Sequence, residues 1–374
     1  MSRATIGKAA LVVLLAVLPL YLDAGYLQNG LFVMAAVVAA IGLTILVGAA
    51  GQLSLAHAFF LAVGAYSYAY FAGTAAKVGA VRAKGLDLPT PLAAVLAVVV
   101  AGFFGLLFSP IASRLKGIYL GVASLSLVFI GTFFYETSKG ITGGFNGRDV
   151  RLFSLPGIEF SDKTLIVVAG VPFGRLEKLW ELFLVVTVLA YAFARNVLRG
   201  RMGRAMQTMR DSEVAAAVMG VDVRATKAGA FVLSSMYAGL GGVMLALAFG
   251  RLTPSSFDLA LSVSYLAMIV IGGLGSVGGA AMGAVFVVSL PYLLTRFSGS
   301  IPFVAAQGSG GYSGSQLAVL AYGLAVIAFV LFEPGGLSAL GRRLVGRRPV
   351  RALDPAPQAS PSTATVGATS EENA

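Results

Sequence analysis

The amino-acid sequence predicts an all-α, polytopic membrane protein with about ten transmembrane helices. Only 11% of the 374 residues are charged and 57% are hydrophobic, and the mean hydropathy is +0.87. A soluble globular domain has about 25% charged residues. The apolar residues come in runs of about 20 rather than in amphipathic stripes. These runs favour one membrane domain, residues 1–340, followed by a basic tail, residues 341–374.

The candidate membrane spans are residues 9–22, 31–49, 52–73, 92–113, 118–135, 179–194, 228–250, 260–275, 279–296 and 315–333. The first span follows Arg3 and Lys8, as the apolar part of a signal peptide would. However, Leu22, Asp23 and Ala24 do not form a small-x-small cleavage site. We therefore expect this segment to stay in the protein as a membrane anchor.

Lys and Arg gather in three clusters, and basic residues near helix ends are retained on the cytoplasmic side. The clusters are Arg3 and Lys8; Arg195, Arg199, Arg201, Arg204, Arg210, Arg224 and Lys227; and Arg342, Arg343, Arg347, Arg348 and Arg351. Six predicted spans separate the first two clusters and four separate the last two, so all three can lie inside the cell. This predicts an N-in, C-in topology with a cytoplasmic loop at 195–227 and an external loop at 136–178. Lys77, Arg82 and Lys84 then lie outside, a mild violation of the rule.

The net charge of +11 does not indicate a nucleic-acid partner. The basic residues lie mostly at the ends of apolar runs, and few aromatic residues are interleaved with them. Beyond Arg351 the chain is rich in Pro, Ser, Thr, Ala and Glu, a composition that cannot bury enough apolar surface to fold. We expect residues 341–374 to form a disordered cytoplasmic tail.

The sequence lacks the residues that several kinds of chemistry require. Without cysteine and with a single histidine, it offers no disulfide, no cysteine nucleophile and no recognisable metal site, and we expect neither a cofactor nor catalytic residues. No acidic residue lies at membrane depth, although ion-coupled transporters commonly place one there. Sodium can be held by backbone carbonyls alone, so an ion-coupled secondary transporter stays an alternative. A P-loop is also absent, because the one Gly-Lys pair, at residues 7–8, is followed by alanine.

Glycines interrupt one apolar run near residue 50, and polar residues follow them. Gln52, Ser54 and His57 lie within two helical turns of each other. A helix that is broken at membrane depth normally faces protein or a water-filled path. These three residues are therefore candidates for lining a translocation path. The alternative is an ordinary turn between helices, in which they cap the next helix.

A second glycine pattern lies in the other half of the chain. Gly275, Gly279 and Gly283 recur every four residues, so we expect them to share one helix face and to allow close packing of a neighbouring helix. Interrupted segments therefore occur in both halves, at 48–56 and 272–279. This arrangement suggests an inverted repeat with a pathway between its halves.

The chain resembles the permease subunits of branched-chain amino acid ABC importers, of the LivM type. That family carries a Gly-Gln-x-Ser-x-Gly-His-Ala signature followed by Gly-Ala-Tyr. The matching residues are Gly51, Gln52, Ser54, His57, Ala58 and Gly64 to Tyr66, whereas Ala56 replaces a glycine. Similar motifs follow in the same order at 115–119, 141–147, 203–220, 274–276 and 333–337, so the resemblance covers roughly residues 40–340.

The resemblance also implies a role for residues 203–220, which look like the coupling loop of ABC importers. The residues concerned are Arg204, Glu213, Ala215, Ala216 and Gly220. Glu213 stands near the start of a short predicted helix that a glycine ends, between basic residues. Such a knob suits a groove on a soluble ATPase. The alternative is a juxtamembrane helix that rests on anionic lipid headgroups.

The function implied by the resemblance is import of leucine, isoleucine and valine across a bacterial inner membrane. The implied partners are a homologous permease subunit, in a heterodimer, two cytoplasmic ATP-binding subunits and a periplasmic solute-binding protein. A permease for urea or another small solute is the alternative within the same superfamily.

Overall fold

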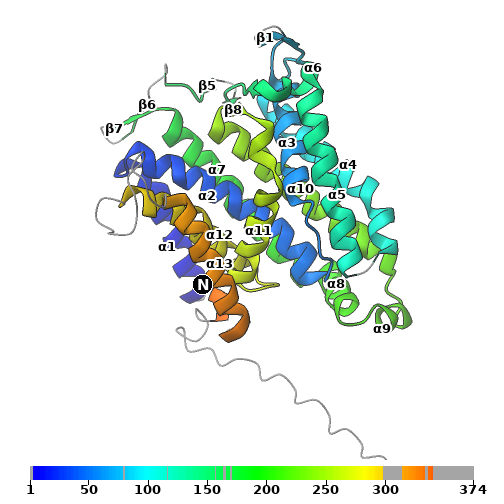
Figure 1. The fold of residues 1–374 in the computed structure, drawn as a ribbon. Helices are drawn as coiled ribbons and strands as arrows, with labels where there is room; N and C mark the ends of the chain where they lie inside the picture. Colours follow the sequence, from blue (N-terminus) through cyan, green and yellow to red (C-terminus); the bar gives the residue numbers. More distant parts are fainter. Residues whose placement is uncertain are drawn as a thin grey trace, which may run out of the picture.

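The computed structural model describes residues 3–78, 81–115, 117–155, 157–162, 166–168, 171–297, 314–332 and 336–339. The expected tail at 341–374 lies outside the described residues. The described chain is a bundle of apolar helices whose loops carry short two-stranded pairs (Figure 1). The prediction of an all-α, polytopic protein is thereby confirmed.

Each predicted span overlaps a helix in the described chain. The helices are α1 (Arg3–Val17), α2 (Ala24–Leu43) continued by a π-helix (Thr44–Ala49), α3 (His57–Ala72), α4 (Thr90–Arg114), α5 (Ile118–Thr137), α7 (Arg175–Arg199), α10 (Val223–Phe249), α11 (Leu259–Gly272), α12 (Val277–Arg296) and α13 (Gly314–Phe332). Among the described residues, seven helices are long and apolar enough to cross a membrane. The other three predicted spans correspond to α3, with 16 residues, and to the shorter apolar stretches Ala9–Leu20 and Val319–Ala328. Helix α3 is shorter than the predicted 52–73 because the chain becomes helical only at His57.

Polar side chains at the helix starts explain several boundaries. The carboxylate of Asp222 accepts a hydrogen bond from the amide of Ala225 (3.0 Å) at the start of α10, and Asp258 caps α11 in the same way. Ser276 caps α12. A side-chain acceptor at this position satisfies one of the free amides of the first turn. Two acidic residues at span edges therefore serve as helix caps.

Helix α10 lies at the centre of the bundle and packs against α2, α3 and α4. Small residues allow these helices to approach closely. A Cβ atom added to Gly64 would overlap the backbone of Gly239, and one added to Gly242 would overlap the carbonyl of Leu61. Without a hydrophobic driving force between helices inside a bilayer, such close backbone packing is a main source of association.

One end of the bundle carries short strands and turns. The strand pairs are β1 (Ala76–Val78) with β2 (Val81–Ala83), β3 (Arg148–Asp149) with β8 (Arg251–Leu252), β4 (Ser154–Leu155) with β5 (Ile158–Glu159), and β6 (Ile166–Val168) with β7 (Val171–Phe173), all antiparallel. The short helices α6 (Lys139–Thr142) and η3 (Gly144–Asn146) lie among them. Most of this layer comes from the predicted loop 136–178, although α5 extends to Thr137 and α7 begins at Arg175.

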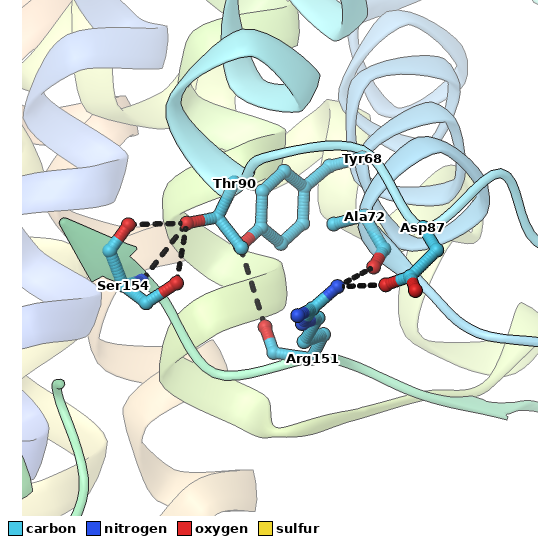
Figure 2. A network of polar contacts seen from close by, with 6 residues as sticks. All are labelled: Tyr68, Ala72, Asp87, Thr90, Arg151 and Ser154. Carbon is cyan, nitrogen blue, oxygen red and sulfur yellow. Dashed lines mark hydrogen bonds and ion pairs between the residues drawn. The ribbon is translucent and has the colours of Figure 1, made fainter. Parts of the chain in front are cut away.

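Polar contacts fasten this layer to the ends of α3 and α4 (Figure 2). The Thr90 hydroxyl donates to the carbonyl of Ser154 (2.7 Å) and accepts from its amide (2.9 Å). The Tyr68 hydroxyl donates to the carbonyl of Arg151 (3.3 Å), whose guanidinium pairs with Asp87. The segment after β3 is therefore held on the bundle rather than projecting from it.

The opposite end carries two short helices between α7 and α10, namely α8 (Arg201–Asp211) and α9 (Glu213–Val218). In Figure 1 they lie at the lower right, while β1, α6 and β5 lie at the upper side. We call residues 200–222 the α8–α9 loop.

Candidate functional site

The break in the first half begins where the π-helix ends. Gly51 has a left-handed backbone (φ +67°) that turns the chain, and α3 starts only at His57. The amide of Gln52 donates to the carbonyl of Leu46 (3.0 Å). Residues 51–56 therefore run as an irregular segment between two buried helices.

Serine side chains satisfy the backbone of this broken helix. The hydroxyl of Ser124 on α5 accepts a hydrogen bond from the amide of Leu55 (2.8 Å), and that of Ser262 on α11 accepts from the amide of Ala58 (2.9 Å). An unsatisfied buried amide costs about 1–3 kcal/mol, so these contacts make the break possible. The sequence did not single out either serine, although each is a polar residue inside an apolar run.

The three path candidates are all buried inside the chain. The Nε2 atom of His57 lies 3.0 Å from the carbonyl oxygen of Ala39, and its ring packs edge-on against Tyr265. Ser54 accepts from the amide of Ala56 (3.3 Å). These contacts fix the positions of both side chains, and their role in a translocation path stays a prediction. Gln52 differs, because among the described residues its buried Oε1 atom has no hydrogen-bond partner.

The break in the second half separates α11 from α12. Gly273 (φ +105°) and Gly275 (φ +80°) have backbone conformations that L-residues rarely adopt. Gly275 therefore lies in the turn before the Ser276 cap and not on the helix face where we expected it. Gly279 and Gly283 do lie on α12, where an added Cβ atom would overlap the backbone of α11.

The two breaks meet each other. A Cβ atom added to Gly48 would overlap the backbone nitrogen and Cα of Gly275. One added to Gly336 would lie 2.5 Å from the backbone nitrogen of Gly273. Segments from residues 48, 275 and 336 therefore converge, and each belongs to or adjoins a motif singled out in the sequence. We call the contact between Gly48 and Gly275 the glycine junction.

The α8–α9 loop reaches this junction through Arg210. The Nη1 atom of Arg210 donates a hydrogen bond of 2.5 Å to the carbonyl oxygen of Gly48. Helix α8 is anchored beneath it by the buried side chains of Met206 and Met209 and contacts the π-helix and α10.

Helix α9 combines an anchored face with an exposed apolar face. Ser212 caps it by accepting from the amide of Ala215 (3.2 Å), and Ala216 is fully buried in the chain. The exposed fractions of Val214, Val218 and Met219 are 74%, 84% and 66%. Ala216 is therefore used in internal packing, whereas the three larger side chains are free to meet a partner.

The remaining loop residues surround this helix. Gly220 has a left-handed backbone (φ +80°) just after α9, with no atom near the place of a Cβ. Arg204 is exposed and donates to the carbonyl of Arg199 on the preceding helix (3.0 Å). Glu213 pairs with Lys227 at the start of α10 (2.8 Å). The start of α9 is therefore fastened to α10, while its apolar tip stays exposed.

The motif at 141–147 shapes the opposite end. Thr142 donates from its hydroxyl to the carbonyl of Tyr135 (2.6 Å), and Gly143, Gly144 and Gly147 all have positive φ. The buried guanidinium of Arg148 donates to the carbonyl of Ile141 (2.8 Å), which closes the turn. Burial lowers the pKa of Arg148, but an arginine remains charged at any physiological pH.

Comparison with known proteins places these motifs in one family. The model of the family described as "Branched-chain amino acid transport system / permease component" matches residues 26–332. The chain is 30% identical over 300 residues to the high-affinity branched-chain amino acid transport system permease protein LivM of Escherichia coli, covering 77% of this chain and 68% of that protein. It is 25% identical over 308 residues to the permease protein BraD of Pseudomonas aeruginosa, covering 81% and 90%. It is 26% identical over 274 residues to the LivH permease of Salmonella typhimurium, covering 71% and 84%. No solved structure matches the chain.

The matched region includes both breaks, the glycine junction of residues 48 and 275, and the α8–α9 loop. The chain is a transport subunit. It is a multi-pass membrane protein and belongs to the family of permease components of branched-chain amino acid transport systems.

Proposed function

We propose that this chain is the membrane-spanning subunit of an ATP-driven importer that carries leucine, isoleucine and valine across a bacterial inner membrane. The single observation that carries the proposal is the α8–α9 loop. It presents an anchored helix with an exposed apolar tip in a chain whose family consists of transport permeases.

The tip of α9 is proposed to enter a groove on a cytoplasmic ATP-binding subunit. Val214 and Val218 lie one turn apart on α9, Met219 follows at its end, and all three side chains are exposed. Exposed apolar patches with polar surroundings commonly mark sites of protein interaction. The chain has no P-loop of its own, so ATP would be hydrolysed by two such partner subunits.

The orientation proposed is N-in and C-in. The N-terminal end of α1, the α8–α9 loop and the C-terminal end of α13 lie toward the same side, opposite the hairpins (Figure 1). Exposed Arg199, Arg201 and Arg204 lie on that side, as expected for a cytoplasmic surface. The hairpin layer would then face the periplasm and meet a solute-binding protein.

A second permease subunit is proposed to complete the transporter. LivM and LivH are both named as permeases of branched-chain amino acid systems, and this chain is similar to both. This supports a heterodimer of related subunits. The names of these relatives also support branched-chain amino acids as the substrate, in preference to urea or another small solute.

Reconstitution with the partner subunits in proteoliposomes tests the proposal. Radiolabelled leucine should accumulate only when the binding protein is outside and ATP is inside with the ATPases. A proton or sodium gradient without ATP should drive no uptake. Accumulation by this chain alone under an ion gradient would instead establish the secondary-transporter alternative.

The role of α9 can be tested with two variants of equal charge change. Val218→Glu places a carboxylate on the apolar tip, whereas Gln207→Glu adds the same charge to an exposed position on α8. Val218→Glu should lose the ATPase subunits on purification, because burying an unpaired charge is strongly unfavourable. Gln207→Glu should retain them. Equal retention by both variants would favour a helix that rests on lipid headgroups.

A further inference from the structure

Arg210 joins three separate pieces of the fold. It lies in the last turn of α8, two residues before the Ser212 cap of α9. Its Nη1 atom donates to the carbonyl oxygen of Gly48 (2.5 Å). A Cβ atom added to Gly275 would lie 3.7 Å from the same nitrogen. One side chain thus links the α8–α9 loop to both broken segments.

The Gly48 carbonyl is a suitable acceptor for a cation. It lies in the last turn of the π-helix Thr44–Ala49, and the last carbonyls of a helix have no donor within the helix. The negative end of the helix dipole also favours a positive charge there. The guanidinium of Arg210 satisfies both requirements.

The neighbouring glycines make room for this contact. The stem of Arg210 lies against Gly51, because a Cβ atom at Gly51 would come within 2.9 Å of its Cγ. Gly51 also needs its positive φ to turn the chain. Gly51 in the first break therefore leaves the space that the stem of Arg210 occupies.

We propose that Arg210 is a positioning residue that transmits movement of the α8–α9 loop to the glycine junction. When a bound ATPase displaces α9, the hydrogen bond to Gly48 carries the displacement to the point where both broken helices meet. Transport and ATP hydrolysis are thereby coupled. This inference rests on the proposed function, in which the tip of α9 contacts the ATPase.

The test uses the complete reconstituted transporter and Arg210→Met, which keeps an unbranched stem against Gly51 but removes the donor. Arg201→Met is the matched control, since Arg201 is also exposed on α8 and carries the same charge. Arg210→Met should keep the ATPase subunits and their hydrolysis rate, while leucine transported per ATP falls roughly tenfold, a typical coupling factor. Arg201→Met should transport as the unmodified protein does. Arg210→Lys should recover part of the ratio because it restores a charged donor.

A structural measurement accompanies the kinetics, because the chain has no native cysteine. Spin labels at Gln207→Cys on α8 and Leu274→Cys in the exposed turn of the second break report the distance between the loop and the junction. The distance distribution should be narrow with Arg210 and broad with Arg210→Met. A merely charged surface residue would leave it unchanged.

The outcomes separate this inference from the proposed function. If the unmodified complex shows no ATP-dependent uptake, the proposed function fails. If it transports and Arg210→Met transports as much leucine per ATP with an unchanged distance distribution, only the role of Arg210 is overturned. Loss of the ATPases from Arg210→Met also overturns it, because Arg210 would then belong to the docking surface. Arg210→Ala, which also lacks a donor, carries the same expectations should the methionine variant fail to fold.

Discussion

Glu213 and Lys227 form an ion pair of 2.8 Å that fastens the start of α9 to the first turns of α10. The side chain of Lys227 is only 1% exposed, whereas that of Glu213 is 24% exposed. Removing one partner of a buried pair leaves a charge without compensation, which costs roughly 3–5 kcal/mol. The pair therefore sets the position of α9 on the bundle.

Glu213→Ala should consequently be more destabilising than the double variant Glu213→Ala, Lys227→Met. The single variant leaves the buried ammonium unpaired, with a cost of about 3 kcal/mol because Glu213 is partly exposed, and the double variant removes that charge. Thermal unfolding of the detergent-purified protein gives the order of stability. Asp211→Ala, a change at an exposed acid in the same loop, is the control. Equal stability of the single and double variants would mean that the pair does not fix α9.

Ser262→Ala should destabilise the first break. It removes the acceptor of the Ala58 amide (2.9 Å) and leaves a buried N–H group unsatisfied, at a cost of about 1–3 kcal/mol. Ser264→Ala is the matched control, because among the described residues the Ser264 hydroxyl bonds within α11, to the carbonyl of Ala260 (2.9 Å). The difference in melting temperature between the two variants measures the contact. Identical values would show that the amide of Ala58 finds another acceptor.

Gly283→Ala should destabilise the protein and Gly278→Ala should not, although both residues lie on α12. A Cβ atom at Gly283 would overlap the carbonyl of Met268, and backbone cannot move aside cheaply. At Gly278 the nearest atom would be the hydroxyl of Tyr191, at an ordinary 3.7 Å. Alanine exceeds glycine in helix propensity by about 1 kcal/mol, so Gly278→Ala should be neutral or stabilising. The melting temperature and the yield of folded protein of each variant test this prediction. A Gly283→Ala variant as stable as the unmodified protein would argue against close packing of α11 on α12.

Single cysteines at Val218 and Phe145 should be labelled from opposite sides of the membrane. Both side chains are exposed, one on α9 and the other on η3 in the hairpin layer. In intact cells, a membrane-impermeant maleimide should label Phe145→Cys and leave Val218→Cys unmodified until the cells are opened. The cysteine-free background removes competing thiols. The reverse pattern would contradict both the topology and the proposed position of the ATPases.

The membrane character of the chain and the order of its helices were determined by the sequence itself. The apolar runs, the scarcity of charge and the glycine breaks at 48–56 and 272–279 are local properties that need no knowledge of distant contacts. The start and end of α9 also depend on neighbouring residues alone, since Ser212 caps the helix and Gly220 follows it in a left-handed conformation.

The tertiary structure alone decided which residues meet. The sequence suggested Gln52, Ser54 and His57 as path residues, which stays a prediction. Helix packing buries all three, and each side chain has a backbone hydrogen-bond partner. Arg210 and Gly48 are 162 positions apart, and no pattern along the chain predicts that they are in contact. Local propensities act over a few residues, whereas such contacts depend on how whole helices pack. The glycine junction and its link to the α8–α9 loop therefore emerged only from the fold.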